Sequence, residues 1–295
     1  MNIKRAFISI IIPVFVFIFS CSGQNYTPVE RNVPSGVVVE KDINYVSYNN
    51  RQLFLDIYRP SNVGNEKLPV LIVVRGGGWA RGDKEGFGHM AAALAQRGFA
   101  SICIEYRTST EALFPAALMD LKSAVQWIES NSDKYGFDPY SIGAVGGSAG
   151  AHLAALLGVT SKINSLNPSA RDEGFAIQAV VGLAPLMDFT KLSDNKGIVK
   201  WLGKPLVVDY ELWKSASPIS YVDKDTPPML LIHSSSDPVV HYEQSILAID
   251  KLAKMDIYTE LVLIPNAPHA FWNYEEWFEY TMDKTASFFR AKLIE

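Results

Sequence analysis

Residues 142–157 read IGAVGGSAGAHLAALL, and this stretch decides the fold. It opens with a short apolar run typical of a buried strand and closes with a helix-forming segment rich in Ala and Leu. Between the two, residues 146–150 read GGSAG and fit the pattern G-x-S-x-G. After a strand and before a helix, this pattern predicts a tight turn that exposes a serine hydroxyl. We therefore expect Ser148 to be a nucleophile within an α/β domain.

A second glycine-rich segment, RGGGW at residues 75–79, directly follows the apolar run 69–74. Three successive glycines let the backbone fold back and turn its N–H groups toward a site. A hydroxyl nucleophile needs such donors because its tetrahedral intermediate develops a negative charge. The alternatives are a flexible loop or a phosphate-binding loop, and the segment lacks the Gly-Lys-Ser/Thr ending of the latter. Residues 75–79 therefore predict an oxyanion-binding loop.

Strand and helix patterns alternate from Val37 onward, which is typical of an α/β domain with a mainly parallel sheet. Two segments around Asn49-Asn50 predict an opening hairpin, 43–48 and 51–58. Later strands are continuous apolar runs, as expected where helices cover both faces of a sheet: 69–74, 99–104, 142–145, 179–183, 229–233 and 259–264. Helices are predicted at 87–97, 116–130, 149–157, 243–254 and 274–291. Residues 185–218 break the alternation and predict a small cap over the carboxyl edge of the sheet, where ligands bind.

A serine nucleophile requires a base, and the base requires a group that orients it. Of the five histidines, His269 follows the last predicted strand, whereas His152 lies one turn beyond Ser148 and is expected to pack or cap. Asp237 follows the strand 229–233, although an aspartate before a proline is also a common turn residue. The chain order Ser148, Asp237, His269 is that of the α/β-hydrolase fold, so we expect these three to form a catalytic triad.

Beyond residue 36, nearly the whole sequence resembles a bacterial esterase/lipase family that includes acetyl esterases and xylan-debranching acetyl and feruloyl esterases. YR followed by FPAA within residues 106–117 is particularly specific to this group. The other matching stretches are 75–84, 138–156, 215–222, 232–244 and the loop around His269. The resemblance implies an α/β-hydrolase fold with a mainly parallel sheet, flanking helices and a small cap. It also implies a triad and an oxyanion hole formed by Ser148, Asp237, His269 and the amides of Gly77, Gly78 and Ala149.

Three positions depart from the family pattern. Arg75 stands where a histidine is usual, so the oxyanion loop must be held by different bonds. Residues 233–237 read HSSSD in place of His-Gly-Asp-x-Asp, and His241 replaces a usual proline. None of these departures removes a member of the predicted triad.

The resemblance and the triad together predict a serine carboxylic-ester hydrolase that removes short acyl groups, above all acetyl, from a carbohydrate or a small ester. Trp79, beside the oxyanion glycines, is expected to form a wall of the acyl pocket. The two-step chemistry needs no metal and no organic cofactor, and none is expected. Two alternatives stay open: an amidase of the formamidase type, which shares the Gly-Gly-Trp loop, and a binding domain that has lost catalysis.

The first 20 residues form a separate segment. Two basic residues precede an apolar run at 6–19, and small polar residues follow, which is the layout of a signal peptide. The alternative is an uncleaved anchor helix, for which the run is short. Residues 18–21, IFSC, resemble a bacterial lipobox, so Cys21 is expected to carry the lipid. The predicted organisation is a signal peptide at 1–20, a lipid-anchored tether at 21–36 and a hydrolase domain at 37–295, exported and facing the periplasm.

Composition supports one exported globular domain. The chain has 295 residues, of which 48% are hydrophobic, enough for one large core. Removing Lys4 and Arg5 with the leader lowers the 27 basic residues to 25 against 31 acidic ones, a net charge of −6. This charge and the lack of a basic run exclude nucleic acid as an expected partner. Cys103 lies in an apolar run and is expected to be buried, so no disulfide framework is predicted.

Overall fold

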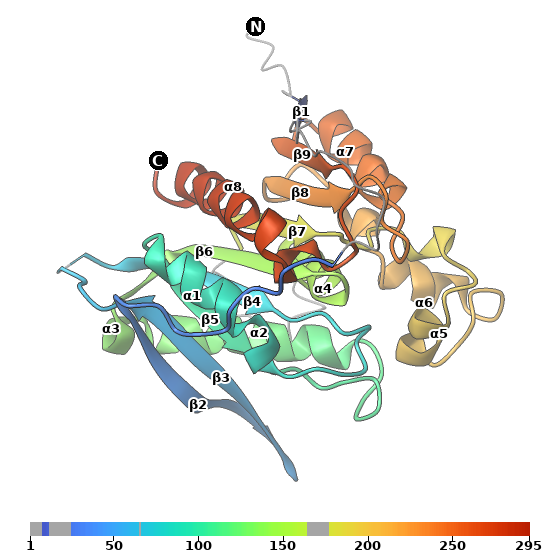
Figure 1. Ribbon diagram of the computed structural model, residues 1–295. Helices are drawn as coiled ribbons and strands as arrows, with labels where there is room; N and C mark the ends of the chain where they lie inside the picture. The colour runs from blue at the N-terminus through green and yellow to red at the C-terminus, as the bar shows by residue number, and fades with distance from the viewer. Residues whose placement is uncertain (1–7, 12–24, 65, 164–176) are drawn as a thin grey trace, which may run out of the picture.

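The computed structural model describes residues 8–11, 25–64, 66–163 and 177–295. They form a mainly parallel sheet with helices on both faces, which confirms the predicted α/β-hydrolase fold (Figure 1). The strands run across the sheet in the order β1-β9-β8-β7-β6-β4-β5-β3-β2. Their bounds are β1 (Ile8–Ile11), β2 (Val37–Tyr48), β3 (Arg51–Pro60), β4 (Leu68–Val74), β5 (Ala100–Ile104), β6 (Phe137–Gly147), β7 (Ala179–Leu183), β8 (Met229–Ser234) and β9 (Thr259–Ile264).

The predicted hairpin is confirmed at one edge of the sheet. β2 and β3 are antiparallel and are joined by Asn49-Asn50, with Tyr48 opposite Arg51. β3 also pairs antiparallel with β5, and the other described strand pairs are parallel. Parallel strands bring their carboxyl ends to one edge, and there the loops after β4, β6, β8 and β9 can meet.

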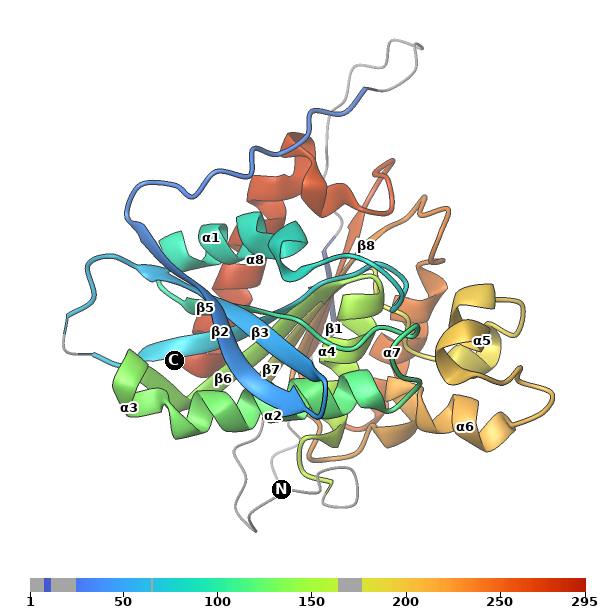
Figure 2. The same cartoon turned by 90° about the horizontal axis from the view of Figure 1, so that it is seen from below.

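Helices cover both faces of this sheet. α1 (Gly88–Gln96) and α8 (Glu275–Leu293) pack on one face (Figure 2). The other face carries α2 (Ala116–Ser130), α3 (Ser132–Tyr135), α4 (Ala149–Thr160) and α7 (Glu243–Lys254). Because neither face meets solvent, strands such as β4 and β8 are apolar along nearly their whole length. α2 and α7 have the predicted bounds, whereas α4 continues to Thr160.

The predicted cap lies between β7 and β8. It contains η3 (Phe189–Lys191), α5 (Lys196–Leu202), α6 (Tyr210–Ser215) and η4 (Pro218–Tyr221), and α5 and α6 project to one side of the sheet (Figure 1). Helices this short depend on their ends. The Asn195 side chain accepts the first free amides of α5, Gly203 ends α5 in the left-handed conformation, and Asp209 caps α6.

Part of the segment predicted as a tether contacts the hydrolase domain. Residues 25–36 are described, and part of them lies against the start of α8. The amide of Val29 donates to the Asn273 carbonyl at 2.9 Å, and the Glu275 amide donates to the Thr27 carbonyl at 2.8 Å. The Tyr26 ring meets the Trp277 ring edge-on at 4.8 Å. These contacts make residues 26–29 part of the folded domain, because an aromatic side chain and a backbone pair both gain partners there.

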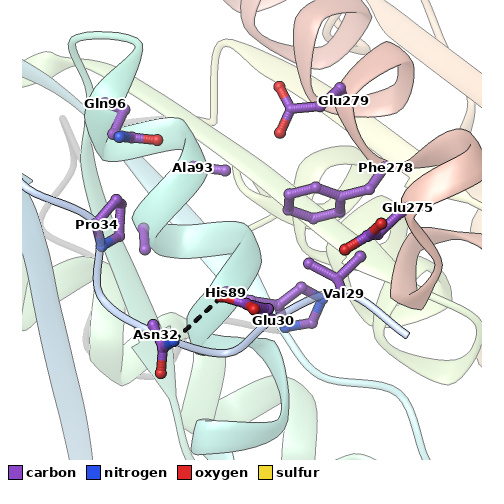
Figure 3. A pocket seen from close by; sticks show the side chains of 11 residues that line it. Val29, Glu30, Asn32, Pro34, His89, Ala93, Gln96, Glu275, Phe278 and Glu279 are labelled. Atoms are coloured by element: carbon purple, nitrogen blue, oxygen red, sulfur yellow. Dashed lines mark hydrogen bonds between the residues drawn. The ribbon is translucent and has the colours of Figure 1, made fainter. Parts of the chain in front are cut away.

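A pocket of about 500 Å³ lies between this N-terminal segment, α1 and α8. Figure 3 shows the side chains that line it, among them Glu30, His89, Phe278 and Glu279. His89 is buried, and its Nε2 lies 3.3 Å from the Trp272 carbonyl oxygen. Burial lowers the pKa of His89 to about 4, so the ring is neutral near pH 7. His89 therefore serves the packing of α1 against the loop before α8.

Two observations bear on the predicted leader. Ile8–Ile11 form β1, which pairs in parallel with β9, whereas the other residues of the predicted signal peptide, and Cys21 after it, lie outside the described residues. In a chain cleaved before Cys21, β9 would be the edge strand at this side. Among the helices within the described ranges, none is both long and apolar enough to cross a bilayer.

Candidate active site

Ser148 occupies the turn between β6 and α4, as G-x-S-x-G predicts. Its backbone is in a strained left-handed region, with φ 57° and ψ −123°. The following turn is crowded, because a Cβ on Gly150 would lie 2.1 Å from the Val74 carbonyl oxygen. The Ser148 amide donates to the Leu183 carbonyl at 2.8 Å, which fixes the turn against β7. The last glycine of the motif is therefore a steric requirement, because any larger side chain at residue 150 would push α4 away from β4.

The structure brings Ser148, Asp237 and His269 together in a continuous hydrogen-bonded line. His269 Nε2 lies 2.8 Å from Ser148 Oγ, and His269 Nδ1 lies 2.7 Å from Asp237 Oδ2. A carboxylate only accepts, so Nδ1 carries the hydrogen and Nε2 presents a lone pair to the hydroxyl. This tautomer is the one that can remove the proton of Ser148.

Asp237 is held so that it stays ionised. Its Oδ1 accepts the amides of Val239 and Val240 at 2.8 and 2.9 Å. Burial by itself would raise the pKa of Asp237, but hydrogen bonds from His233, His269 and these amides outweigh it and hold the pKa well below its usual range. Asp237 therefore serves both roles considered for it in the sequence. Its Oδ1 closes the turn at Pro238, and its Oδ2 faces His269.

His233 was not among the predicted site residues, yet it borders the acid. It is fully buried at the end of β8, and its Nε2 lies 2.8 Å from the Val240 carbonyl oxygen and 3.5 Å from Asp237 Oδ2. Its Nδ1 lies 2.8 Å from Ser245 Oγ. Because a carbonyl cannot donate, Nε2 must carry a hydrogen, which also faces the carboxylate. In the sequence, the position of His233 four residues before Asp237 was the signal that could have placed it beside the acid.

The glycine loop lies directly against the elbow. A Cβ on Gly76 would be 2.7 Å from the Gly147 carbonyl oxygen and 3.5 Å from Ser148 Cβ. Gly77 has φ +106°, and a Cβ there would lie 2.0 Å from the Arg81 carbonyl oxygen, so this position excludes any side chain. The predicted oxyanion donors, the amides of Gly77, Gly78 and Ala149, form no hydrogen bond with another described residue. They are thus free to bind an anion beside Ser148.

Arg75 supplies the bonds that hold this loop. Its side chain is 4% exposed, and Nη1 donates to the carbonyls of Arg81 at 2.7 Å and Gly76 at 3.2 Å. The guanidinium carbon lies 4.1 Å from the centre of the Tyr106 ring, and Nη1 is 3.3 Å from the Tyr106 hydroxyl. A planar guanidinium can bond several carbonyls and stack on a ring at once, which a histidine cannot. The departure at residue 75 therefore keeps the loop in place by another set of contacts.

Trp79, predicted to form a wall of the acyl pocket, is nearly buried. Its side chain is 2% exposed, and its ring stacks on Trp201 of α5 at a centroid distance of 5.1 Å. Its Nε1 donates to His152 at 3.2 Å. Trp201 and Trp213 are fully buried, and Trp272 is nearly so. Trp79, Trp201 and Trp213 each meet Phe189 of the cap edge-on, whereas the Trp272 ring lies beside Phe87 and His269. Contact between Trp79 and a substrate stays a prediction.

No group of three His, Cys, Asp or Glu residues within the described ranges has the geometry to hold a metal ion. The site instead consists of a hydroxyl, an imidazole, a carboxylate and free backbone amides. Together these groups can perform nucleophilic acyl transfer, since each required role has a side chain or an amide at the right place.

The fold and this arrangement of side chains define a protein of the α/β-hydrolase class. Comparison with known families narrows this class: the BD-FAE family model matches residues 55–252, and the chain belongs to that family. The predicted resemblance to an α/β-hydrolase esterase family is thereby confirmed.

Curated relatives agree with this family. The chain is 31% identical over 246 residues to the probable carboxylic ester hydrolase LipM of Mycobacterium tuberculosis. This alignment covers 78% of this chain and 56% of LipM. It is 34% identical over 233 residues to the esterase LipQ of the same organism, covering 75% of this chain and 55% of LipQ. The chain therefore spans about half the length of these curated relatives.

Solved structures match over more of their length. A truncated carbohydrate esterase from gut microbiota superposes with a TM-score of 0.76 and 26% identity, covering 91% of this chain and 100% of that one. The apo form of Thermogutta terrifontis esterase 2 has a TM-score of 0.73 and 25% identity, with 86% and 94% of the two chains covered.

Proposed function

We propose that this protein is a serine esterase that hydrolyses carboxylic esters through Ser148, His269 and Asp237. The observation that carries the proposal is the unbroken line of two short hydrogen bonds from Asp237 through His269 to Ser148, at a strained elbow beside free amides. Two curated relatives are named as a probable carboxylic ester hydrolase and an esterase, which supports the same chemistry.

The proposed reaction has two steps. His269 Nε2 takes the proton of Ser148 as Oγ attacks the ester carbonyl carbon, and Asp237 stabilises the imidazolium that forms. The amides of Gly77, Gly78 and Ala149 bind the oxyanion. The tetrahedral intermediate collapses, the alcohol leaves with the proton from His269, and an acyl group remains on Ser148. Water, deprotonated by His269, then releases the acid and restores the serine.

The test of this proposal is Ser148→Ala, measured on an aryl acetate. We expect a folded protein whose kcat falls about 10³-fold or more, because triad members act as a unit. Ser161→Ala, in the residue that follows α4, is the matched control and should keep full activity. Activity of Ser148→Ala within tenfold of the unaltered protein contradicts the proposal.

A short acyl group is the proposed substrate feature. The aromatic side chains of the cap are already used in packing, since Phe189, Trp201 and Trp213 are fully buried. They offer no broad apolar surface to a long chain, and the cap also carries charged residues such as Lys196 and Lys200. We therefore propose acetyl as the preferred acyl group.

A carbohydrate ester is the proposed source of that acetyl group. Two similar structures are named as a carbohydrate esterase from gut microbiota and as a bifunctional GH43-CE protein of Bacteroides eggerthii. A panel of acetylated xylan, a feruloyl ester, an aryl acetate and an aryl amide tests this choice. Release of acetate from the xylan supports it, and faster hydrolysis of the amide would favour the amidase alternative.

Export as a lipoprotein is the proposed location, with Cys21 acylated after cleavage of residues 1–20. The support is the lipobox-like sequence IFSC at residues 18–21. Cys21→Ser should release the protein from the membrane fraction, because the acyl chains provide the anchor. Retention of the variant in membranes after a carbonate wash would favour an uncleaved helix.

A further inference from the structure

His152 stands at the junction of three parts of the active site. It lies on α4 one turn after Ser148 and is fully buried. Its Nδ1 is 3.2 Å from Trp79 Nε1 in the oxyanion loop, and its Nε2 is 2.8 Å from the Ala216 carbonyl oxygen of the cap. One imidazole therefore connects the nucleophile helix, the oxyanion loop and the cap.

The hydrogen-bond partners fix the direction of both bonds. The Ala216 carbonyl can only accept, so His152 Nε2 must carry the hydrogen. The lone pair of Nδ1 is then available to Trp79, whose indole N–H can only donate. Burial lowers the pKa of His152 to about 3, so the ring stays neutral and this arrangement persists at any working pH of an esterase.

Trp79 is a residue that needs such a restraint. Its φ of 59° lies in the left-handed region, which is unusual for a bulky side chain, and it directly follows Gly78. Its carbonyl accepts the Ser109 amide at 2.8 Å, which fixes one side of its backbone. The ring is clamped between Trp201 and the hydrogen bond to His152. Trp79 is thus held at both its ring and its carbonyl, directly after Gly77 and Gly78.

The cap completes the clamp. Phe189 of η3 stacks on His152 at a centroid distance of 4.4 Å and an interplanar angle of 17°. Phe189 also meets the Trp79 ring edge-on at 5.5 Å, and the Phe189 amide donates to Ser217 Oγ beside Ala216. A ring that is stacked on one side and bonded at both nitrogens has one available orientation.

We infer that His152 is a positioning residue: through Nδ1 it holds Trp79, and Trp79 in turn directs the Gly77 and Gly78 amides at the oxyanion formed on Ser148. The cap acts as a fixed support of this loop instead of a moving lid. This inference rests on the proposed esterase function, because its effect is on stabilisation of the transition state. Loss of the Trp79 bond should lower kcat and leave KM nearly unchanged, since the amides act mainly on the developing charge.

Two variants of one residue separate the two hydrogen bonds. The amide of His152→Asn lies where Nδ1 lies and can accept the Trp79 N–H, whereas the longer His152→Gln reaches Ala216 and leaves Trp79 without an acceptor. Both variants lose the ring, so both lose the stacking on Phe189. We expect His152→Gln to lower kcat about five- to tenfold with KM within twofold, and His152→Asn to retain kcat within twofold. A purely structural role would affect both variants alike.

Trp79→Phe provides the second arm, because it keeps an aromatic ring and removes only the N–H and part of the stacking. It should show the same loss of kcat as His152→Gln, and the double variant should be no worse than Trp79→Phe alone. Equal kcat losses in His152→Asn and His152→Gln, or no loss in either, would overturn the inference. If neither His152 variant folds, an unchanged kcat of Trp79→Phe overturns it. An unaltered protein without esterase activity would instead refute the proposed function.

Discussion

Asp237→Asn is the change that most sharply probes the proposed triad. The asparagine oxygen must take the place of Oδ1, because two amides, those of Val239 and Val240, donate there at 2.8 and 2.9 Å. The NH₂ group then replaces Oδ2 and faces His269 Nδ1, which lies 2.7 Å from that position. Two donors cannot face each other, so His269 must move its hydrogen to Nε2.

The magnitude follows from this tautomer. With the hydrogen on Nε2, His269 presents a donor to Ser148 and can no longer remove its proton. Reversal of the tautomer in a serine–histidine–aspartate triad lowers kcat about 10⁴-fold, which is about 5.4 kcal/mol of activation free energy at 1.36 kcal/mol per tenfold. His233 Nε2, 3.5 Å from Oδ2, is a second donor at this position, so it does not favour the NH₂ group there either.

Initial rates on an aryl acetate near pH 8 measure this loss, with the melting temperature recorded to establish folding. Asp223→Asn is the matched control: Asp223 lies in the turn before β8, where its Oδ1 accepts the Asp225 amide at 2.9 Å. The control should retain kcat within twofold. A loss below tenfold for Asp237→Asn, or an equal loss for Asp223→Asn, would show that Asp237 is not the acid.

Three further outcomes are expected. Arg75→Lys keeps the charge but loses the planar guanidinium, which bonds the Gly76 and Arg81 carbonyls through Nη1 while it stacks on Tyr106, so kcat should fall about tenfold with KM changed less than threefold; unchanged steady-state kinetics would contradict this role. For aryl esters, kcat/KM should be highest for acetyl or propionyl and fall steeply by octanoyl, because each methylene left unburied forfeits about 0.8 kcal/mol; a profile that rises with chain length would indicate a lipase. Burial lowers the pKa of Lys122 to about 8 against 10.5 in the unfolded chain, so the folded state disfavours its charge and the free energy of unfolding should rise by about 3 kcal/mol between pH 8 and pH 10.5. Urea unfolding of Lys122→Met should lack this rise, and an identical pH dependence in both proteins would refute the shift.

Local patterns in the sequence were sufficient to predict the sheet and the elbow. The apolar runs 69–74 and 229–233 correspond to β4 and β8 because a strand covered on both faces has no polar side. The GGSAG motif predicts its own turn, since close approach at Gly150 follows from the motif itself. The order of Ser148, Asp237 and His269 along the chain was enough to select the three residues that the structure brings together.

Features that depend on distant partners could not be predicted in the same way. Residues 26–29 have a loop-like composition, and their contacts with α8 involve residues about 250 positions away. Trp79 has the same local sequence whether its ring faces a pocket or the cap, and only Trp201 and His152 determine which. For Arg75, the sequence revealed a departure from the family, whereas the bonds to Arg81 and Tyr106 that compensate for it required the folded loop.

Covalent labelling of Ser148 tests the central claim most directly. The unaltered protein, treated with a fluorophosphonate and digested, should carry one adduct, on the peptide that contains Ser148, and its esterase activity should fall in step with labelling. Ser148→Ala should remain unlabelled, and His269→Ala should label far more slowly because the hydroxyl loses its base. An adduct on a different residue, or an active protein that resists labelling at Ser148, would contradict the account.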